Sequence, residues 1–159
     1  MNLTSIIFKF IPSQVAYAHC DIPCGVYDPT PLQIAAHTVL RMTQLLGAAS
    51  AESDSAHDVA RLTRVKEKHG ELVEDELGTL ENDYFKEEHY KANPDLKDLI
   101  KEAVKLSIEA RQHVDLEKSQ DLLEKTLLVS EIFYKTKNVT PVRVPSLYPT
   151  KGEIVTYKA

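Results

Sequence analysis

Residues 59–80 of the chain read VARLTRVKEKHGELVEDELGTL, with apolar side chains at intervals of three and four residues. This spacing places them along one side of an α-helix. The pattern extends over about three heptads and is the most regular signal in the chain. We expect an amphipathic helix whose apolar side faces a core. The stripe consists of Val59, Leu62, Val65, His69, Leu72, Val73, Leu77 and Leu80.

Three other segments show the same helical spacing. Pro31 suits the first turn of a helix that runs from Thr30 to about Gly47. Asn93-Pro94-Asp95 is a helix start signal for residues up to 108, and a last stripe runs from 116 to 134. Short connections between amphipathic helices favour antiparallel neighbours. The sequence therefore predicts an all-α fold, an up-down antiparallel four-helix bundle.

Length and composition set further bounds. The chain has 159 residues, 43% of them hydrophobic, which indicates one globular domain with a single core. Its net charge is −5, whereas binding to nucleic acid or to an anionic membrane requires a basic face. Glycine-rich phosphate-binding motifs are absent from the sequence. We expect no nucleic acid, no membrane and no nucleotide among its partners.

The two ends differ from the middle of the chain. Residues 1–18 contain an apolar run and end in Ala16-Tyr17-Ala18, the A-x-A form that a processing protease cleaves after. No basic residue precedes the run and Lys9 interrupts it, which favours a short pro-segment and a cytoplasmic protein over an export signal. Residues 138–159 contain three prolines, which exclude a helix. They are predicted to form an irregular C-terminal tail of unknown role.

Reactive side chains are concentrated in residues 19–29, HCDIPCGVYDP, which contain both cysteines. Cleavage after residue 18 gives His19 a free amine beside its imidazole. Pro23 and Gly25 permit a turn that brings Cys24 back over Cys20. The amine, the Cys20 amide and the two sulfurs then form a planar N2S2 set. Such a set suits Ni(II) or Cu(II) better than zinc, which prefers tetrahedral side-chain ligands. On spacing alone, a small-loop disulfide or two buried thiols also explain the pair.

Three segments resemble the nickel superoxide dismutase family. Residues 19–29 meet every specified position of its N-terminal metal hook, H-C-x-x-P-C-G-x-Y-D-P. Residues 83–89 resemble its D-Y-F-K-x-x-H segment, and residues 132–137, IFYKTK, resemble its C-terminus. The resemblance covers residues 19–137 and implies a four-helix bundle with hook 19–29, assembled as a homohexamer. The enzyme expected is an antioxidant oxidoreductase that converts superoxide to dioxygen and hydrogen peroxide.

The resemblance also implies roles for individual residues. Nickel is expected to bind the His19 amine and imidazole, the Cys20 amide and thiolate, and the Cys24 thiolate, and to cycle between Ni(II) and Ni(III). Tyr27 and Tyr84 are expected to flank the open axial face and to hold superoxide, peroxide or water. Asp21 is expected to help fix the hook.

Some positions depart from the family pattern. A Glu and an Arg that orient the axial imidazole in the family correspond, by counting, to Ala35 and His69 in this chain. His69 is a candidate to replace them in part. Lys86, near Tyr84, either steers superoxide locally or is a plain surface lysine. His37, His57, His89 and His113 have no second ligand at a clear spacing and are expected in solvated or core roles.

Two other functions fit the same residues. A non-enzymatic nickel or copper carrier could use the same hook, although a carrier has no need of Tyr27 and Tyr84 around an open coordination face. A secreted helical interaction module with a Cys20–Cys24 disulfide is the other alternative.

Overall fold

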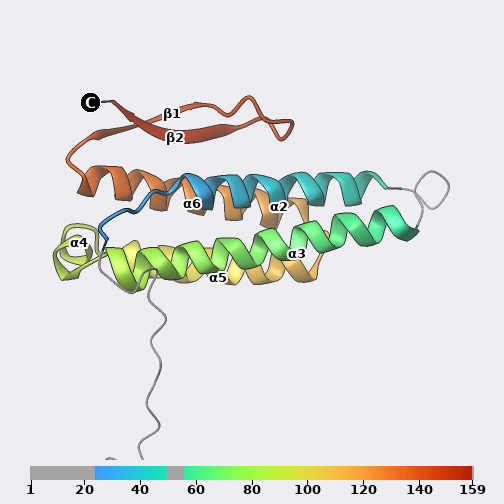
Figure 1. Ribbon diagram of the computed structural model, residues 1–159, viewed down its shortest axis with the longest axis horizontal. Coiled ribbons are helices and arrows are strands. Elements are labelled where there is room, and N and C mark those ends of the chain that lie inside the picture. The colour runs from blue at the N-terminus through green and yellow to red at the C-terminus, as the bar shows by residue number, and fades with distance from the viewer. Residues whose placement is uncertain (1–23, 50–55, 159) are drawn as a thin grey trace, which may run out of the picture.

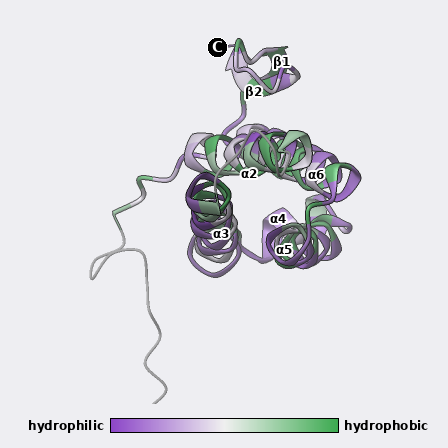
Figure 2. Cartoon of the chain, turned by 90° about the vertical axis from the view of Figure 1, so that its right-hand side faces the viewer, coloured by the Kyte–Doolittle hydropathy of each residue, from purple (hydrophilic) through white to green (hydrophobic). Residues whose placement is uncertain are grey.

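Four long helices packed around one apolar core dominate the computed structural model, which describes residues 24–49 and 56–158 (Figure 1). They are α2 (Thr30–Ala48), α3 (Ala56–Thr79), α5 (Leu96–Gln112) and α6 (Leu116–Thr136). Successive long helices run in opposite directions, and in end view α2 and α6 lie side by side over α3 and α5 (Figure 2). The predicted four-helix bundle is confirmed.

All four long helices contribute fully buried side chains to the core. Removing one such aliphatic side chain from water stabilises the fold by roughly 1.5–3 kcal/mol. Asp115 caps the start of α6, because its carboxylate accepts a hydrogen bond from the Lys118 backbone N at 3.0 Å. The core includes Leu32, Val39, Val73, Leu77, Ile100, Ala103, Leu122 and Val129.

The buried face of α3 differs from the predicted one. Val59, Val65 and Leu72 are each 37% exposed, whereas Lys66 is only 2% exposed. The helix turns Gly70 toward α5, where the Ser107 hydroxyl donates to the Gly70 carbonyl O at 2.9 Å. This close approach requires a small residue. The C-terminal part of the predicted stripe, Val73, Leu77 and Leu80, is buried as expected, whereas Val59, Val65 and Leu72 lie beside the buried face.

A π-helix and a short helix connect α3 to α5 at one end of the bundle. The π-helix η1 (Leu80–Tyr84) closes with a hydrogen bond from the Phe85 N to the Leu80 O at 2.8 Å. Helix α4 (Glu87–Ala92) follows, and the His89 Nδ1 accepts from the Lys86 backbone N at 3.0 Å. Helix α5 starts slightly later than predicted, because Asn93 closes a turn by accepting from the Leu96 N at 3.0 Å.

Asn138 redirects the chain at the end of α6. Its φ of 59° lies in the left-handed region, which asparagine tolerates better than most residues. The Val139 N donates to the Tyr134 O at 3.3 Å, and the Asn138 N donates to the Lys135 O at 3.0 Å. These two bonds form a Schellman motif, which turns the chain back over the bundle.

The C-terminal residues form a hairpin, which corrects the expected irregular tail. Strands β1 (Thr140–Pro145) and β2 (Glu153–Lys158) pair antiparallel, with Arg143 opposite Val155. The N–H and C=O groups of Val155 point away from β1 and bind Gln33 of α2. By the alternation of an antiparallel ladder, the nitrogens of Pro141 and Pro145 also point away from the partner strand. The prolines exclude a helix, as predicted, but they are compatible with an edge strand.

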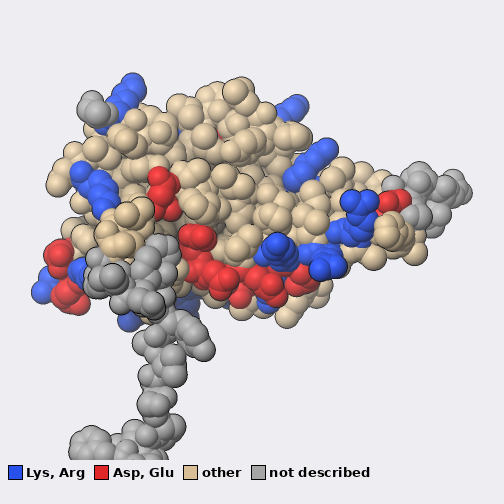
Figure 3. Space-filling view, in the orientation of Figure 1, with Lys and Arg blue, Asp and Glu red and all other residues tan. Residues whose placement is uncertain are grey.

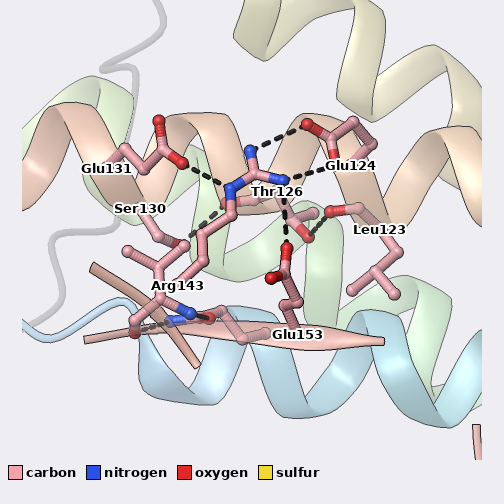
Figure 4. A network of polar contacts seen from close by, with 9 residues as sticks. Leu123, Glu124, Thr126, Ser130, Glu131, Arg143 and Glu153 are labelled. Atoms are coloured by element: carbon pink, nitrogen blue, oxygen red, sulfur yellow. Dashed lines mark hydrogen bonds and ion pairs between the residues drawn. The ribbon is translucent and has the colours of Figure 1, made fainter. Parts of the chain in front are cut away.

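The hairpin lies on the outer side of α2 and α6 (Figures 1 and 2). Arg143 joins it to α6, because its guanidinium donates to Glu124 at 2.8 and 2.9 Å and to Glu131 at 2.6 Å (Figure 4). Glu153 of β2 approaches the same guanidinium at 3.7 Å. The carboxylates raise the pKa of Arg143, chiefly through the hydrogen bonds that Glu124 accepts from its guanidinium.

Candidate metal centre

The described part of the hook begins at Cys24. His19, Cys20 and Asp21 lie outside the described residues, so their roles stay predictions. Cys24 is exposed, and its Sγ accepts a hydrogen bond from the Val26 N at 3.4 Å. An N–H donor favours the thiolate, which is the metal-binding form of cysteine. Gly25 has a φ of 71°, in agreement with the turn expected at this position.

The start of α2 anchors this segment. The Asp28 carboxylate accepts from the Thr30 N at 2.7 Å, and the Pro29 carbonyl accepts from the Gln33 N at 3.2 Å. Pro31 occupies the first turn of the helix, where no N–H is needed. The hook therefore leaves the bundle directly from the N-terminus of α2.

Tyr27 and Tyr84, far apart in the sequence, lie against each other. Their ring centroids are 5.3 Å apart with an interplanar angle of 50°. Tyr84 is the last residue of η1, and single π-helical turns are frequent at functional sites. The π-helix thus places Tyr84 beside the hook segment. The structure brings these two predicted site residues together.

An aromatic cluster fixes the position of Tyr84. Its ring contacts Phe133 at a centroid distance of 4.6 Å and Phe85 at 5.2 Å, and the His89 ring stacks on it at 5.6 Å. His89 is thus a structural member of the site, consistent with the core or solvated role expected for it. The Lys137 Nζ lies 4.7 Å from the Tyr84 ring centroid, within cation–π distance.

Sequence reasoning gave no site role to three neighbours of Tyr84. They are Phe133, Thr136 and Lys137, all from the end of α6. Their only sequence signal was the IFYKTK segment at residues 132–137. Lys86, by contrast, donates from its Nζ to the Asp83 carbonyl O at 2.7 Å. This bond stabilises the turn before α4, and a steering role for Lys86 stays a prediction.

Ala35 and His69 line one pocket next to the hook. The pocket has a volume of about 550 Å³ and is also lined by Asp28, Ile34 and Leu72. The His69 Nδ1 lies 2.8 Å from the Val65 carbonyl O, so Nδ1 carries the proton and Nε2 is the acceptor nitrogen. The two positions that depart from the family pattern therefore share one surface beside the hook.

The described part of the chain has no other cluster of metal-ligating side chains. Within residues 24–49 and 56–158, no three His, Cys, Asp or Glu side chains are grouped so that they could hold a metal ion. Both ring nitrogens of His37 are hydrogen-bonded. Nδ1 lies 2.9 Å from the Thr150 Oγ1, and Nε2 lies 3.0 Å from the Glu153 carbonyl O. Cys24 is the only proposed nickel ligand within the described residues, and its exposed sulfur is a donor that nickel accepts.

Comparison with known proteins identifies the family. The family model described as nickel-containing superoxide dismutase matches residues 14–137. Superoxide dismutase [Ni] of Streptomyces seoulensis is 37% identical over 128 residues, which are 80% of this chain and 95% of that protein. The Streptomyces coelicolor enzyme of the same name is 34% identical over the same shares of both chains. This chain belongs to the nickel-containing superoxide dismutase family.

Solved structures of nickel superoxide dismutase agree with the fold. A crystal structure of Ni-containing superoxide dismutase after partial X-ray-induced reduction has a TM-score of 0.70 and 37% identity. The match covers 76% of this chain and 99% of that one. The predicted family, oxidoreductase class and nickel cofactor are confirmed, and the comparisons favour the dismutase over a carrier. The hairpin lies beyond the residues that the family model matches.

Among the described residues, no helix is both long enough and apolar enough to cross a bilayer.

Proposed function

We propose that this nickel superoxide dismutase holds its metal through the His19 amine and imidazole, the Cys20 amide and thiolate, and the Cys24 thiolate. Bound nickel supplies a redox couple that superoxide can both reduce and oxidise, giving dioxygen and hydrogen peroxide. The observation that carries this proposal is the ring contact of Tyr27 with Tyr84 at 5.3 Å. It places the cysteine segment beside an aromatic cluster that is built from η1 and α6.

The chain's own residues shape the space around the hook. Tyr27 and Tyr84, whose ring centroids are 5.3 Å apart, are proposed to restrict access on one side of the hook to small molecules. Asp21 is proposed to hold the hook in its turn through its carboxylate. Asp28, four residues after Cys24, fixes the end of the hook on α2.

Cysteine substitution tests the ligand assignment. Cys20→Ser and Cys24→Ser should each keep the helical circular dichroism spectrum, because the core lies outside the hook, and should lose nickel and activity. A hydroxyl is a poor donor for nickel compared with a thiolate. Ser50→Ala, far from the hook in the sequence, is the control. Stoichiometric nickel together with full activity in either cysteine variant would contradict the assignment.

The homohexamer is part of the same proposal. Its support is an apolar surface on α2 and α3 formed by Ile34, Val59, Val65 and Leu72, with exposed fractions of 37–46%. Subunit contacts commonly cover apolar patches of this kind. Val65→Lys should lower the mass measured by light scattering, whereas Val114→Lys, exposed between α5 and α6, should not. A monomeric parent protein would contradict the proposal.

Proteolytic processing and cellular location are the last parts of the proposal. We propose that a protease removes residues 1–18 and that the mature enzyme works in the cytoplasm. The A-x-A sequence at 16–18 and the need for a free amine on His19 support the cleavage. N-terminal sequencing of protein from separated cell fractions should find His19 first in the cytoplasmic fraction. Mature protein found only outside the cell would contradict the proposed location.

A further inference from the structure

A row of aromatic side chains connects the hook segment to the C-terminal hairpin. The Tyr27 ring contacts Tyr84, and the Tyr84 ring lies 4.6 Å from that of Phe133. The Phe133 ring lies 5.6 Å from Tyr134, which in turn lies 5.2 Å from Tyr157 of β2. These centroid distances are typical of aromatic pairs in contact. Each ring of this set, which we call the aromatic row, therefore touches the next one.

The aromatic row passes from the hook through the core to solvent. Phe133 is 3% and Tyr134 is 7% exposed, and both belong to the hydrophobic core, whereas Tyr157 is 50% exposed. Tyr157 lies in the hairpin, beyond the residues that the family model matches. The hairpin thus gives the row a solvent-exposed end in a part of the molecule that the family model does not include.

We infer that the aromatic row carries oxidising equivalents from the hook to the surface and so protects the thiolates from the enzyme's own chemistry. The inference rests on the proposed function, because peroxide is formed beside thiolates that it can oxidise. In the presence of a redox metal, superoxide and hydrogen peroxide also give dioxygen, hydroxide and a hydroxyl radical. This radical takes a hydrogen atom from the Tyr27 hydroxyl, which forms water and a tyrosyl radical.

Each further step moves one electron toward the hook and the radical toward Tyr157. Phe133 has no hydroxyl to lose, so it acts as a bridge between Tyr84 and Tyr134. Burial raises the pKa of Tyr134, and the charge of Asp28 raises it further, which identifies Asp28 as a nearby base for the Tyr134 proton. At Tyr157 water accepts the proton. In the net reaction, the hydroxyl radical and the Tyr157 hydroxyl give water and a Tyr157 radical.

A small anionic thiol can restore Tyr157. It gives a hydrogen atom to the tyrosyl radical, and two of the resulting thiyl radicals combine to form a disulfide. Lys158 is exposed next to Tyr157. On the face shown in Figure 3, basic side chains are visible on the hairpin, whereas acidic side chains form a band over α3. An anionic reductant therefore approaches the hairpin more readily than α3.

Ring packing and electron transfer can be separated by conservative variants. Tyr134→Phe and Tyr157→Phe keep the packed ring and remove only the hydroxyl, which makes the ring much harder to oxidise. Tyr148 provides the matched control, because it is also exposed on the hairpin, at 36%. Among the described residues, the ring contact of Tyr148 is with His37, outside the aromatic row.

A photo-oxidant attached to Cys24 tests the aromatic row without nickel. In protein that starts at His19 and carries Cys20→Ser, a ruthenium polypyridyl maleimide reacts with the one remaining thiol, and a flash with an oxidative quencher creates the oxidant there. A nitroso spin trap and peptide mass spectrometry should then find the radical adduct on Tyr157 and not on Tyr148. Tyr134→Phe should lower the Tyr157 adduct roughly tenfold or more, because it raises the barrier to transfer.

Two results of the photo-oxidation would overturn the inference. They are equal labelling of Tyr148 and Tyr157, and an unchanged Tyr157 adduct in Tyr134→Phe. Either result would leave the dismutase function untouched, because the protein is tested without nickel.

The nickel-loaded enzyme tests the protective effect. During turnover of superoxide, Tyr157→Phe should convert Cys24 to its sulfinic acid severalfold faster than the parent, as measured by mass spectrometry. Tyr148→Phe should match the parent. Equal rates of Cys24 oxidation in Tyr157→Phe and Tyr148→Phe would show that the aromatic row does not protect the hook.

Discussion

The Gln33 side chain of α2 pairs with both backbone groups of Val155 in β2. The Val155 N donates to Oε1 at 2.6 Å, and Nε2 donates to the Val155 carbonyl O at 3.1 Å. Both residues are 2% exposed. A glutamine amide thus occupies the position that a third strand would take, and it fixes the hairpin to the bundle.

Gln33→Ala should lower the free energy of unfolding by about 2–4 kcal/mol, because it leaves a buried N–H and a buried C=O of Val155 without partners. Gln120→Ala, exposed in α6, removes the same side chain without this loss and should change the stability little. Urea unfolding of both variants makes the comparison. Equal losses would show that the hairpin does not depend on Gln33.

His37 should make stability depend on pH. Burial lowers the pKa of His37, and the hydrogen bond with the Glu153 carbonyl only partly opposes this. The unfolded chain binds a proton on this imidazole near pH 6.5, and the folded chain binds it only at lower pH. The protonation of His37 therefore has no effect on stability well above about pH 6.5, and stability falls as the pH decreases through and below that value.

The measurement is the urea midpoint between about pH 7.5 and pH 5.5. The parent should lose more stability over this interval than His37→Gln, in which the titrating group is absent. His57→Gln, exposed near the start of α3, should behave like the parent. Identical curves for the parent and His37→Gln would refute the assignment.

Arg143 should be sensitive to a substitution that keeps its charge. Arg143→Lys loses the paired hydrogen bonds to Glu124 and the separate bond to Glu131, because an ammonium cannot form the same fork. The free energy of unfolding should fall by about 1–2 kcal/mol, and added salt should make this loss smaller. Arg61→Lys, exposed on α3, is the control. The prediction is wrong if the two variants unfold at the same urea concentration.

Two glycines of α3 should respond in opposite ways to alanine. A Cβ at Gly70 would lie 2.3 Å from the Arg111 Cγ and 2.4 Å from the Cδ, so the stem of Arg111 must move away from α3. A Cβ at Gly78 meets only the Asn82 Nδ2, at 3.9 Å. Gly78→Ala should stabilise the protein by up to about 1 kcal/mol, and Gly70→Ala should destabilise it. Thermal unfolding of both variants tests the difference in sign.

The sequence predicts the helices well because their periodicity is a local property. It predicts the burial of Val73 and Leu77 but not that of Gly70, which depends on the approach of Ser107 to the Gly70 carbonyl. The apolar spacing favours a buried face with Val65 and Leu72 over one with Lys66 and Gly70. Lys66 is nevertheless buried, because its Nζ donates to the His113 carbonyl at the end of α5 at 2.7 Å.

Local sequence patterns also fail to predict the hairpin docking and the Tyr84 hydrogen bond, because both join residues that are far apart in the chain. Three prolines exclude a helix after Lys137, but the docking of the hairpin depends on Gln33 and His37, more than a hundred residues earlier. Both side chains are polar, so the apolar spacing of α2 gives no reason to expect them to be buried. The cysteine hook differs, because its chemistry lies in eleven consecutive residues that family resemblance identifies directly.

The central claim is that the amine of His19, created by cleavage, is a nickel ligand. Before cleavage this nitrogen is a peptide amide, and afterwards it is a primary amine with a pKa of about 7.7–8.0 that a metal can deprotonate. The deciding measurement compares nickel content, absorption spectrum and superoxide consumption for protein that starts at His19 and for protein that starts at Ala18. We predict that both fold, as circular dichroism will show, and that only the first has the thiolate-to-nickel absorption and full activity. Equal spectra and equal activity in the two proteins would contradict the account.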